Sequence, residues 1–241
     1  MKRIATHGLL AGLAGGLAMA VALMALGEAP LGRAIALEVA NNGPPLDAPF
    51  GRGEQQAGGA LAALIFGAAM GSIFGVVYAL VQPKLHFMDA WQASMALGAT
   101  ALVTIYLVPF LKYPANPPTV GDPETIGQRT LLYLVAMAWS VVASWAVWRL
   151  WQALVNRPNP LELRWRAPLT ATAYVALVTV GLSLLPASPD PVNAPATLIW
   201  QFRMASLGGA VALWTVLATS FGWLSVRPAA DRQKAQVPTA P

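Results

Sequence analysis

The sequence predicts an all-α membrane protein, a polytopic bundle of about six transmembrane helices. Charged residues make up 10% of the 241 residues and hydrophobic residues 56%, whereas a soluble domain usually carries about 25% charged residues. The chain has too little charge to cover a water-facing surface, so most of its surface is expected to face lipid. The absence of cysteine excludes thiolate metal sites, iron–sulfur clusters and disulfides.

Long uncharged segments separate the few charges, and each is long enough to cross a bilayer as a helix. The segments are apolar all round and lack the period-two alternation of a β-barrel, which leaves helices as the structure that satisfies the backbone in lipid. One transmembrane domain, 1–227, is predicted, followed by a polar, proline-containing tail, 228–241, predicted to be disordered and cytoplasmic. The predicted spans are about 8–27, 58–81, 90–111, 130–151, 168–186 and 204–226.

The connections differ in length. Long outer loops rich in Pro, Gly and Asn are predicted around 28–54 and 112–129, and a short inner one at 82–89. The motif at 114–117, Pro-Ala-Asn-Pro, recurs at 186–189 as Pro-Ala-Ser-Pro. A bundle built from repeated helix hairpins would explain this recurrence, as transporters often contain internal repeats. Chance agreement of two proline-rich loops is the alternative.

The positive charges indicate an orientation. With the amino terminus in the cytoplasm, six crossings place both termini there, and the 15 Lys and Arg divide into ten inside and five outside. This asymmetry follows the positive-inside rule for a bacterial inner membrane, so the net charge of +5 indicates topology and not nucleic-acid binding. The first segment could be a signal peptide, but its apolar stretch is long for one, which favours a retained helix.

Glycines recur at intervals of four in the first two spans. They lie at Gly8, Gly12 and Gly16, and again at Gly67, Gly71 and Gly75. Such spacing forms a groove that lets two helices approach closely in lipid, so we expect an antiparallel contact between these spans. The alternative is that glycine is simply common in membrane helices.

The candidate metal ligands are oxygen atoms in the second long outer loop. The two histidines, His7 and His86, form no paired motif, and each is more typical of a membrane interface than of a metal site. Asp122, Glu124 and Asn116 could contact a divalent cation, since such cations accept carboxylate and carbonyl oxygens as ligands. The alternative is that Asp122, followed by Pro123, caps the next helix, and both roles could hold together.

Other charged residues near the outer loops have two interpretations each. Lys112 and Arg129 could pair with the loop acids and lock the loop, or extend to lipid headgroups. Glu28 and Glu38 could concentrate cations at a pore mouth, or simply be solvated. Tyr113 is predicted to be an interfacial anchor.

The sequence gives no sign of an enzyme. It contains no Walker motif, no Ser-His-Asp pattern of plausible geometry and no haem motif, so we predict no catalytic residues and no permanently bound cofactor. An ATPase would have to be another subunit. No ionisable residue lies in the middle of a predicted span, which argues against proton antiport by this chain alone.

The most specific motif lies between the third and fourth spans. It runs through Lys112-Tyr113-Pro114-Ala115-Asn116-Pro117-Pro118 into Gly121-Asp122-Pro123 and Arg129. This loop resembles the signature of the CbtA-type integral membrane proteins, a family of predicted cobalt transporter subunits. The hydropathy pattern is similar along nearly the whole chain, whereas the region 28–38 matches only loosely.

The resemblance implies a membrane subunit of a cobalt transporter, linked to cobalamin synthesis. Cobalt(II) would be the transported ion. The expected partners are the lipid bilayer and a small single-helix subunit with a His-rich end. The alternative is an accessory or scaffold subunit of another membrane complex, with no transport activity of its own.

Overall fold

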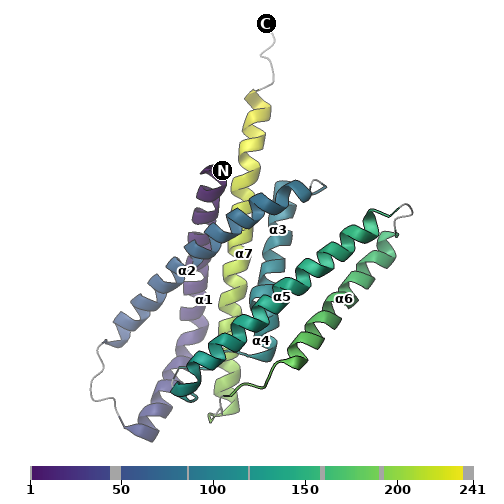
Figure 1. Ribbon diagram of the computed structural model, residues 1–241. Coiled ribbons are helices and arrows are strands. Elements are labelled where there is room, and N and C mark those ends of the chain that lie inside the picture. Colours follow the sequence, from purple (N-terminus) through teal and green to yellow (C-terminus); the bar gives the residue numbers. More distant parts are fainter. Residues whose placement is uncertain are drawn as a thin grey trace. The chain divides into compact units, whose positions relative to one another are not determined.

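The computed structural model describes residues 2–43, 50–85, 87–118, 120–157, 161–189 and 193–235. The described residues form helices and the connections between them, and contain no strand (Figure 1). The long helices are α1 (Lys2–Asn42), α2 (Arg52–Val81), α3 (Ala90–Ala101), α5 (Ile126–Val155), α6 (Leu163–Leu184) and α7 (Ala196–Ala235). The shorter elements are η1 (Gln82–Lys84), η2 (Leu102–Leu107), α4 (Val108–Lys112) and η3 (Pro123–Thr125).

Six described helical segments are long and apolar enough to cross a membrane. The third is composite, because α3, the π-helix η2 and α4 follow one another without a break over Ala90–Lys112. The all-α prediction is therefore confirmed, as is the presence of six long apolar helices among the described residues. The structure describes α7 to Ala235, so helix continues past the predicted start of the tail at 228; residues 236–241 lie outside the described residues.

The first helix is much longer than its predicted span. It has 41 residues, about 60 Å at 1.5 Å per residue, against a hydrocarbon core of about 30 Å. The prediction of an outer loop from residue 28 onward is wrong, because helix continues through the buried Pro30 to Asn42. Residues 31–42 include three Ala and two Leu, which favour helix.

The chain divides into two compact units, which are described separately. Residues 1–102, 117–119 and 195–241 form unit 1, which holds α1, α2, α3 and α7. Residues 103–116 and 120–194 form unit 2, which holds α4, α5 and α6. In unit 1, α1 packs against α2 and α7, and α3 packs against α7. In unit 2, α5 packs against both α4 and α6.

The predicted glycine contact brings the backbones of α1 and α2 together in unit 1. Gly8, Gly12 and Gly16 of α1 face Gly67 and Gly71 of α2, and the contacts run antiparallel. A Cβ placed on Gly71 would stand 2.5 Å from the Gly12 Cα, far inside van der Waals contact. The groove prediction is confirmed, because the two backbones lie where no side chain fits.

The core of unit 1 forms around α7. Leu213, Leu217 and Phe221 of this helix are fully buried. The Phe221 ring packs against Phe74 and Tyr78 of α2, with ring centroids 5.1 Å and 4.8 Å apart. These aromatic contacts join the last helix of the chain to the second.

Interhelical hydrogen bonds join the helices of unit 2. Trp139 Nε1 donates to the Leu177 carbonyl at 2.9 Å, and the Ser140 and Tyr174 hydroxyls lie 3.2 Å apart. Pro109 has no N–H for the carbonyl four residues earlier, that of Ile105. The Tyr133 hydroxyl donates to this carbonyl at 3.3 Å, so α5 supplies the bond that the proline removes.

Candidate functional site

Tyr113 fixes the start of the motif loop. Its backbone N–H bonds the Pro109 carbonyl at 2.8 Å and closes α4. Its side chain is buried, 8% exposed, and its hydroxyl donates to the Pro186 carbonyl at 2.7 Å. Burial raises the pKa of the Tyr113 phenol above its ordinary value, so the hydroxyl keeps the proton that it donates. This hydrogen bond joins the residue before the Pro-Ala-Asn-Pro motif to the first residue of the Pro-Ala-Ser-Pro motif. The sequence predicted Tyr113 only as an interfacial anchor and did not predict this bond.

The middle of the motif loop combines buried prolines with a glycine turn. Pro117 is fully buried and Val120 is buried, whereas Pro114 and Asn116 are half-buried. Gly121 has φ of 110°, a backbone conformation that residues with a Cβ rarely adopt. The glycine of the motif is thus required by the backbone turn that leads into Asp122.

Replacing Gly121 with alanine tests this turn. We expect Gly121→Ala to destabilise the protein by about 1–3 kcal/mol, the usual cost of a strained backbone conformation. The measurement is the midpoint of thermal unfolding of the detergent-solubilised protein. Gly127→Ala is the matched control, because Gly127 lies in α5 with open space around it. Equal midpoints for the two variants would contradict the requirement.

Asp122 caps the helical segment that leads into α5. Its Oδ1 accepts the Glu124 backbone N–H at 2.9 Å, and its carbonyl accepts the Thr125 hydroxyl at 2.8 Å. Pro123 begins η3, where its missing N–H costs nothing. The capping interpretation of Asp122 is confirmed, and one carboxylate oxygen is engaged in that cap.

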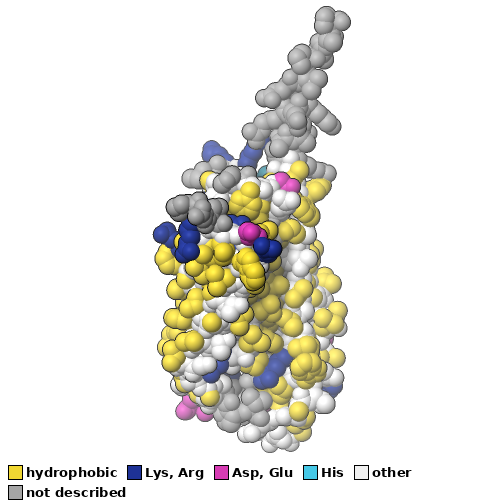
Figure 2. Space-filling view, turned by 90° about the vertical axis from the view of Figure 1, so that its right-hand side faces the viewer, with side chains coloured by type: hydrophobic (Ala, Val, Ile, Leu, Met, Phe, Trp, Pro, Cys, Tyr) yellow, Lys and Arg dark blue, Asp and Glu magenta, His cyan; other side chains and the backbone are white. Residues whose placement is uncertain are grey.

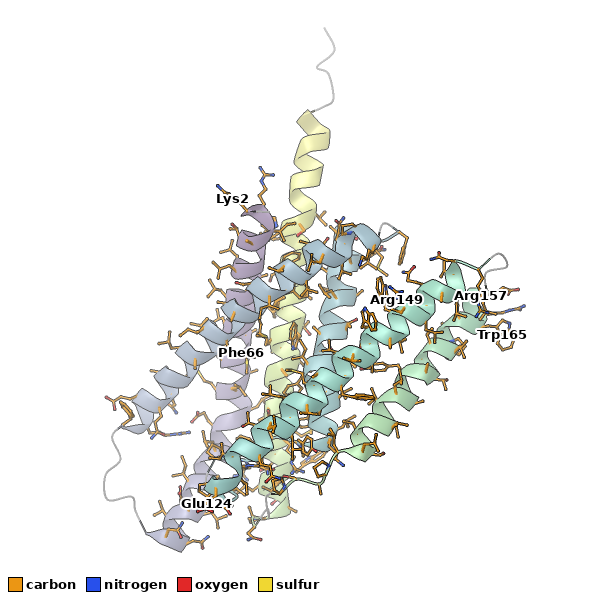
Figure 3. All side chains as sticks on the ribbon, viewed as in Figure 1. Lys2, Phe66, Glu124, Arg149, Arg157 and Trp165 are labelled. Carbon is orange, nitrogen blue, oxygen red and sulfur yellow. The ribbon has the colours of Figure 1, made fainter. Side chains whose placement is uncertain are left out.

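The structure does not gather the predicted metal ligands into a cluster of acidic and histidine side chains among the described residues. Glu124 is exposed at the start of the segment leading into α5 (Figure 3). Within the described part of the chain, neither Lys112 nor Glu124 takes part in an ion pair, so a lock between these two is not observed. Among those same residues, no three His, Asp or Glu side chains gather as a metal site would require. A metal contact by Asp122, Glu124 and Asn116 stays a prediction.

The structure describes one of the two histidines, His7. His7 packs its ring edge-on to Phe221, with centroids 6.4 Å apart, which gives it a packing role in unit 1. His86 lies outside the described residues, so its predicted interfacial place stays a prediction.

A polar cluster in unit 1 was not foreseen from the sequence. Arg52 of α2 bonds Glu28 of α1 at 2.7 Å, and the Gln56 amide donates to the same Glu28 oxygen at 2.9 Å. On the same helix, Arg33 donates to the Gln201 side chain of α7. Glu28 therefore already has a cationic partner, whereas Glu38 lies half-buried further along α1. Only the antiparallel register of α1 and α2 brings Glu28 and Arg52 together, and sequence spacing does not reveal it.

The comparison with protein families agrees with the motif. A family model described as "Probable cobalt transporter subunit (CbtA)" matches residues 1–226. No curated protein and no solved structure matches the chain. The family match extends from the first apolar helix into α7, and so includes the motif loop, all of unit 2 and most of unit 1. The chain therefore belongs to the CbtA family of probable cobalt transporter subunits.

Proposed function

We propose that this chain is the membrane subunit of a cobalt transporter that supplies cobalamin synthesis. The observation that carries the proposal is the family match over residues 1–226. The six apolar helices support it, because a subunit that forms an ion path must cross the membrane. The inner membrane with both termini in the cytoplasm is the location that the distribution of Lys and Arg favours.

A partner subunit is part of this proposal. Cobalt(II) binds imidazole and carboxylate well, and the described residues hold no cluster of such side chains. A small single-helix subunit with a His-rich end would supply the imidazole groups, and this chain would supply the path and the oxygen ligands of the motif loop. The second candidate function, an accessory subunit that transports nothing, is favoured by the same absence of a clustered site among the described residues.

Two substitutions at Asp122 distinguish its role as a helix cap from a role in ion binding. Asparagine caps helices about as well as aspartate, whereas alanine at an N-cap costs about 1 kcal/mol. We therefore expect Asp122→Asn to unfold at the wild-type temperature and Asp122→Ala to unfold earlier. If the carboxylate lies on the ion path, both variants lose most cobalt uptake.

The measurement is cobalt uptake by cells that lack their own cobalt transporters. The cells express the chain alone, with its partner, or as the Asp122→Asn or Glu124→Gln variant. Glu162→Gln is the matched control, because Glu162 is an exposed acid at the start of α6, at the other end of the α5–α6 hairpin from Asp122. Normal uptake by Asp122→Asn would remove the carboxylate from the ion path. Absence of uptake in every combination, with the protein present in the membrane, would favour the accessory function.

A further inference from the structure

The end of the α5–α6 hairpin carries an unusual concentration of arginine. Arg149 lies near the end of α5, Arg157 follows it, and Arg164 and Arg166 lie in the first turn of α6. Glu162 is the only acid between residues 125 and 189, so this end has a formal charge of 4 − 1 = +3. Figure 3 shows Arg149, Arg157 and Trp165 together at this end of unit 2.

The single acid neutralises only one of these arginines. Glu162 pairs with Arg164 at 2.7 Å, and both side chains are largely exposed. Among the described residues, Arg149, Arg157 and Arg166 have no carboxylate partner. Three guanidinium groups at the end of a membrane hairpin thus remain available to an anion.

Aromatic rings hold two of these arginines in place. The Arg166 guanidinium lies 4.7 Å from the centre of the Trp151 ring, and Arg149 lies 5.9 Å from that of Trp145. The Arg166 Nε is buried and has no hydrogen-bond acceptor among the described residues. A phosphate cannot reach this buried Nε, but it can bond the two terminal nitrogens of the Arg166 guanidinium, which are not among the buried atoms without a partner.

Apolar side chains surround the arginines. Three large apolar side chains at this end are exposed: Trp145 (59%), Leu163 (60%) and Trp165 (60%). In the view of Figure 2, hydrophobic side chains cover much of the surface, with Lys and Arg side chains at several places among them. Tryptophan beside arginine is typical of the headgroup level of a bilayer, where an anionic lipid presents its phosphate above its acyl chains.

We propose that the α5–α6 end binds the phosphate of an anionic phospholipid, centred on Arg166 and Trp151. Arg166 bonds the phosphate, and Arg149 and Arg157 add the positive charge that selects an anionic headgroup over a zwitterionic one. The acyl chains lie along the exposed apolar side chains of α5 and α6, such as Val142 and Val175. The inference is independent of which ion the protein transports.

The test is lipid retention by the purified full-length protein. The protein is reconstituted in nanodiscs that contain equal amounts of phosphatidylglycerol and phosphatidylcholine, then released and analysed by native mass spectrometry. We expect the wild type to retain phosphatidylglycerol in preference. Arg166→Gln and Arg157→Gln should each lower this retention about fivefold, the contribution of one basic residue near a membrane surface.

Arg164→Gln is the matched control, because it removes one positive charge from the same end of the hairpin. Arg164 already pairs with Glu162, so its charge is not available to a lipid phosphate. We expect this variant to retain nearly the wild-type amount. Arg157 is exposed and contacts no ring or carboxylate among the residues that the structure describes, so its variant tests the site without a risk to folding. Equal retention of the two lipids would overturn the proposal. An equal loss in all three variants would overturn it too, by showing a charge effect without a site.

Discussion

Gly71→Ala is expected to separate α1 from α2 and to destabilise the protein by about 3 kcal/mol or more, at or beyond the upper end of the usual cost of overpacking. The added Cβ would stand 2.5 Å from the Gly12 Cα and would also overlap the Gly8 carbonyl. Both neighbours are backbone atoms, so no side-chain rotation relieves the overlap. Relief requires the helices to move apart, which removes the packing that holds them together in lipid.

The measurement is thermal unfolding in detergent, together with the yield of monodisperse protein. Gly58→Ala in the same helix is the control, since Gly58 has open space around it. Alanine favours helix over glycine, so the control should be neutral or slightly more stable. A Gly71→Ala variant as stable as the control would show that α1 and α2 do not approach as described.

Gly98→Ala is expected to destabilise the contact of α3 with α7 by about 2 kcal/mol, within the range for one extra methyl in a packed interface. A Cβ at Gly98 would overlap the Ala218 Cβ, while the next atoms are 3.7 Å away. One turn earlier, the fully buried Ser94 donates to the Ala218 carbonyl at 2.7 Å. The variant thus strains both the packing and a buried hydrogen bond.

The overlap involves one methyl group, so a second substitution can remove it. We expect Gly98→Ala combined with Ala218→Gly to regain most of the lost stability, less the cost of about 0.5–1 kcal/mol for a glycine within a helix. The four unfolding midpoints form a double-mutant cycle whose coupling energy measures the contact. Additive effects of the two substitutions would contradict the direct contact of Gly98 with Ala218.

The sequence allowed prediction of features that depend on local pattern. Uncharged runs predicted the six spans because the cost of charge in lipid leaves few alternatives. The four-residue spacing of Gly8, Gly12 and Gly16 predicted the helix contact because only glycine permits such an approach. Asp122 before Pro123 predicted a cap because the N-cap is set by adjacent residues.

Features that depend on register or on tertiary support were not predictable. Pro30 and its neighbouring glycines indicated a loop, but the helix continues because a single proline removes only one backbone bond. The pairing of Glu28 with Arg52 and the bond from Tyr113 to Pro186 join residues 24 and 73 positions apart. No local pattern specifies such partners, which the packing of whole helices brings together.

The division of the chain into units has a consequence for its biosynthesis. A ribosome delivers helices to the membrane in order, and domains tend to fold as they emerge. The helices of unit 2 come from one nearly continuous stretch and can pack as soon as they are inserted. In unit 1 only the contact of α1 with α2 can form early, since α1 and α3 both pack against α7, which follows them in the sequence. Gly15 of α1 meets its Leu213 and Leu217 contacts only at that stage, so a chain that stops short of α7 leaves α1 without one of its two partners and α3 without its main one.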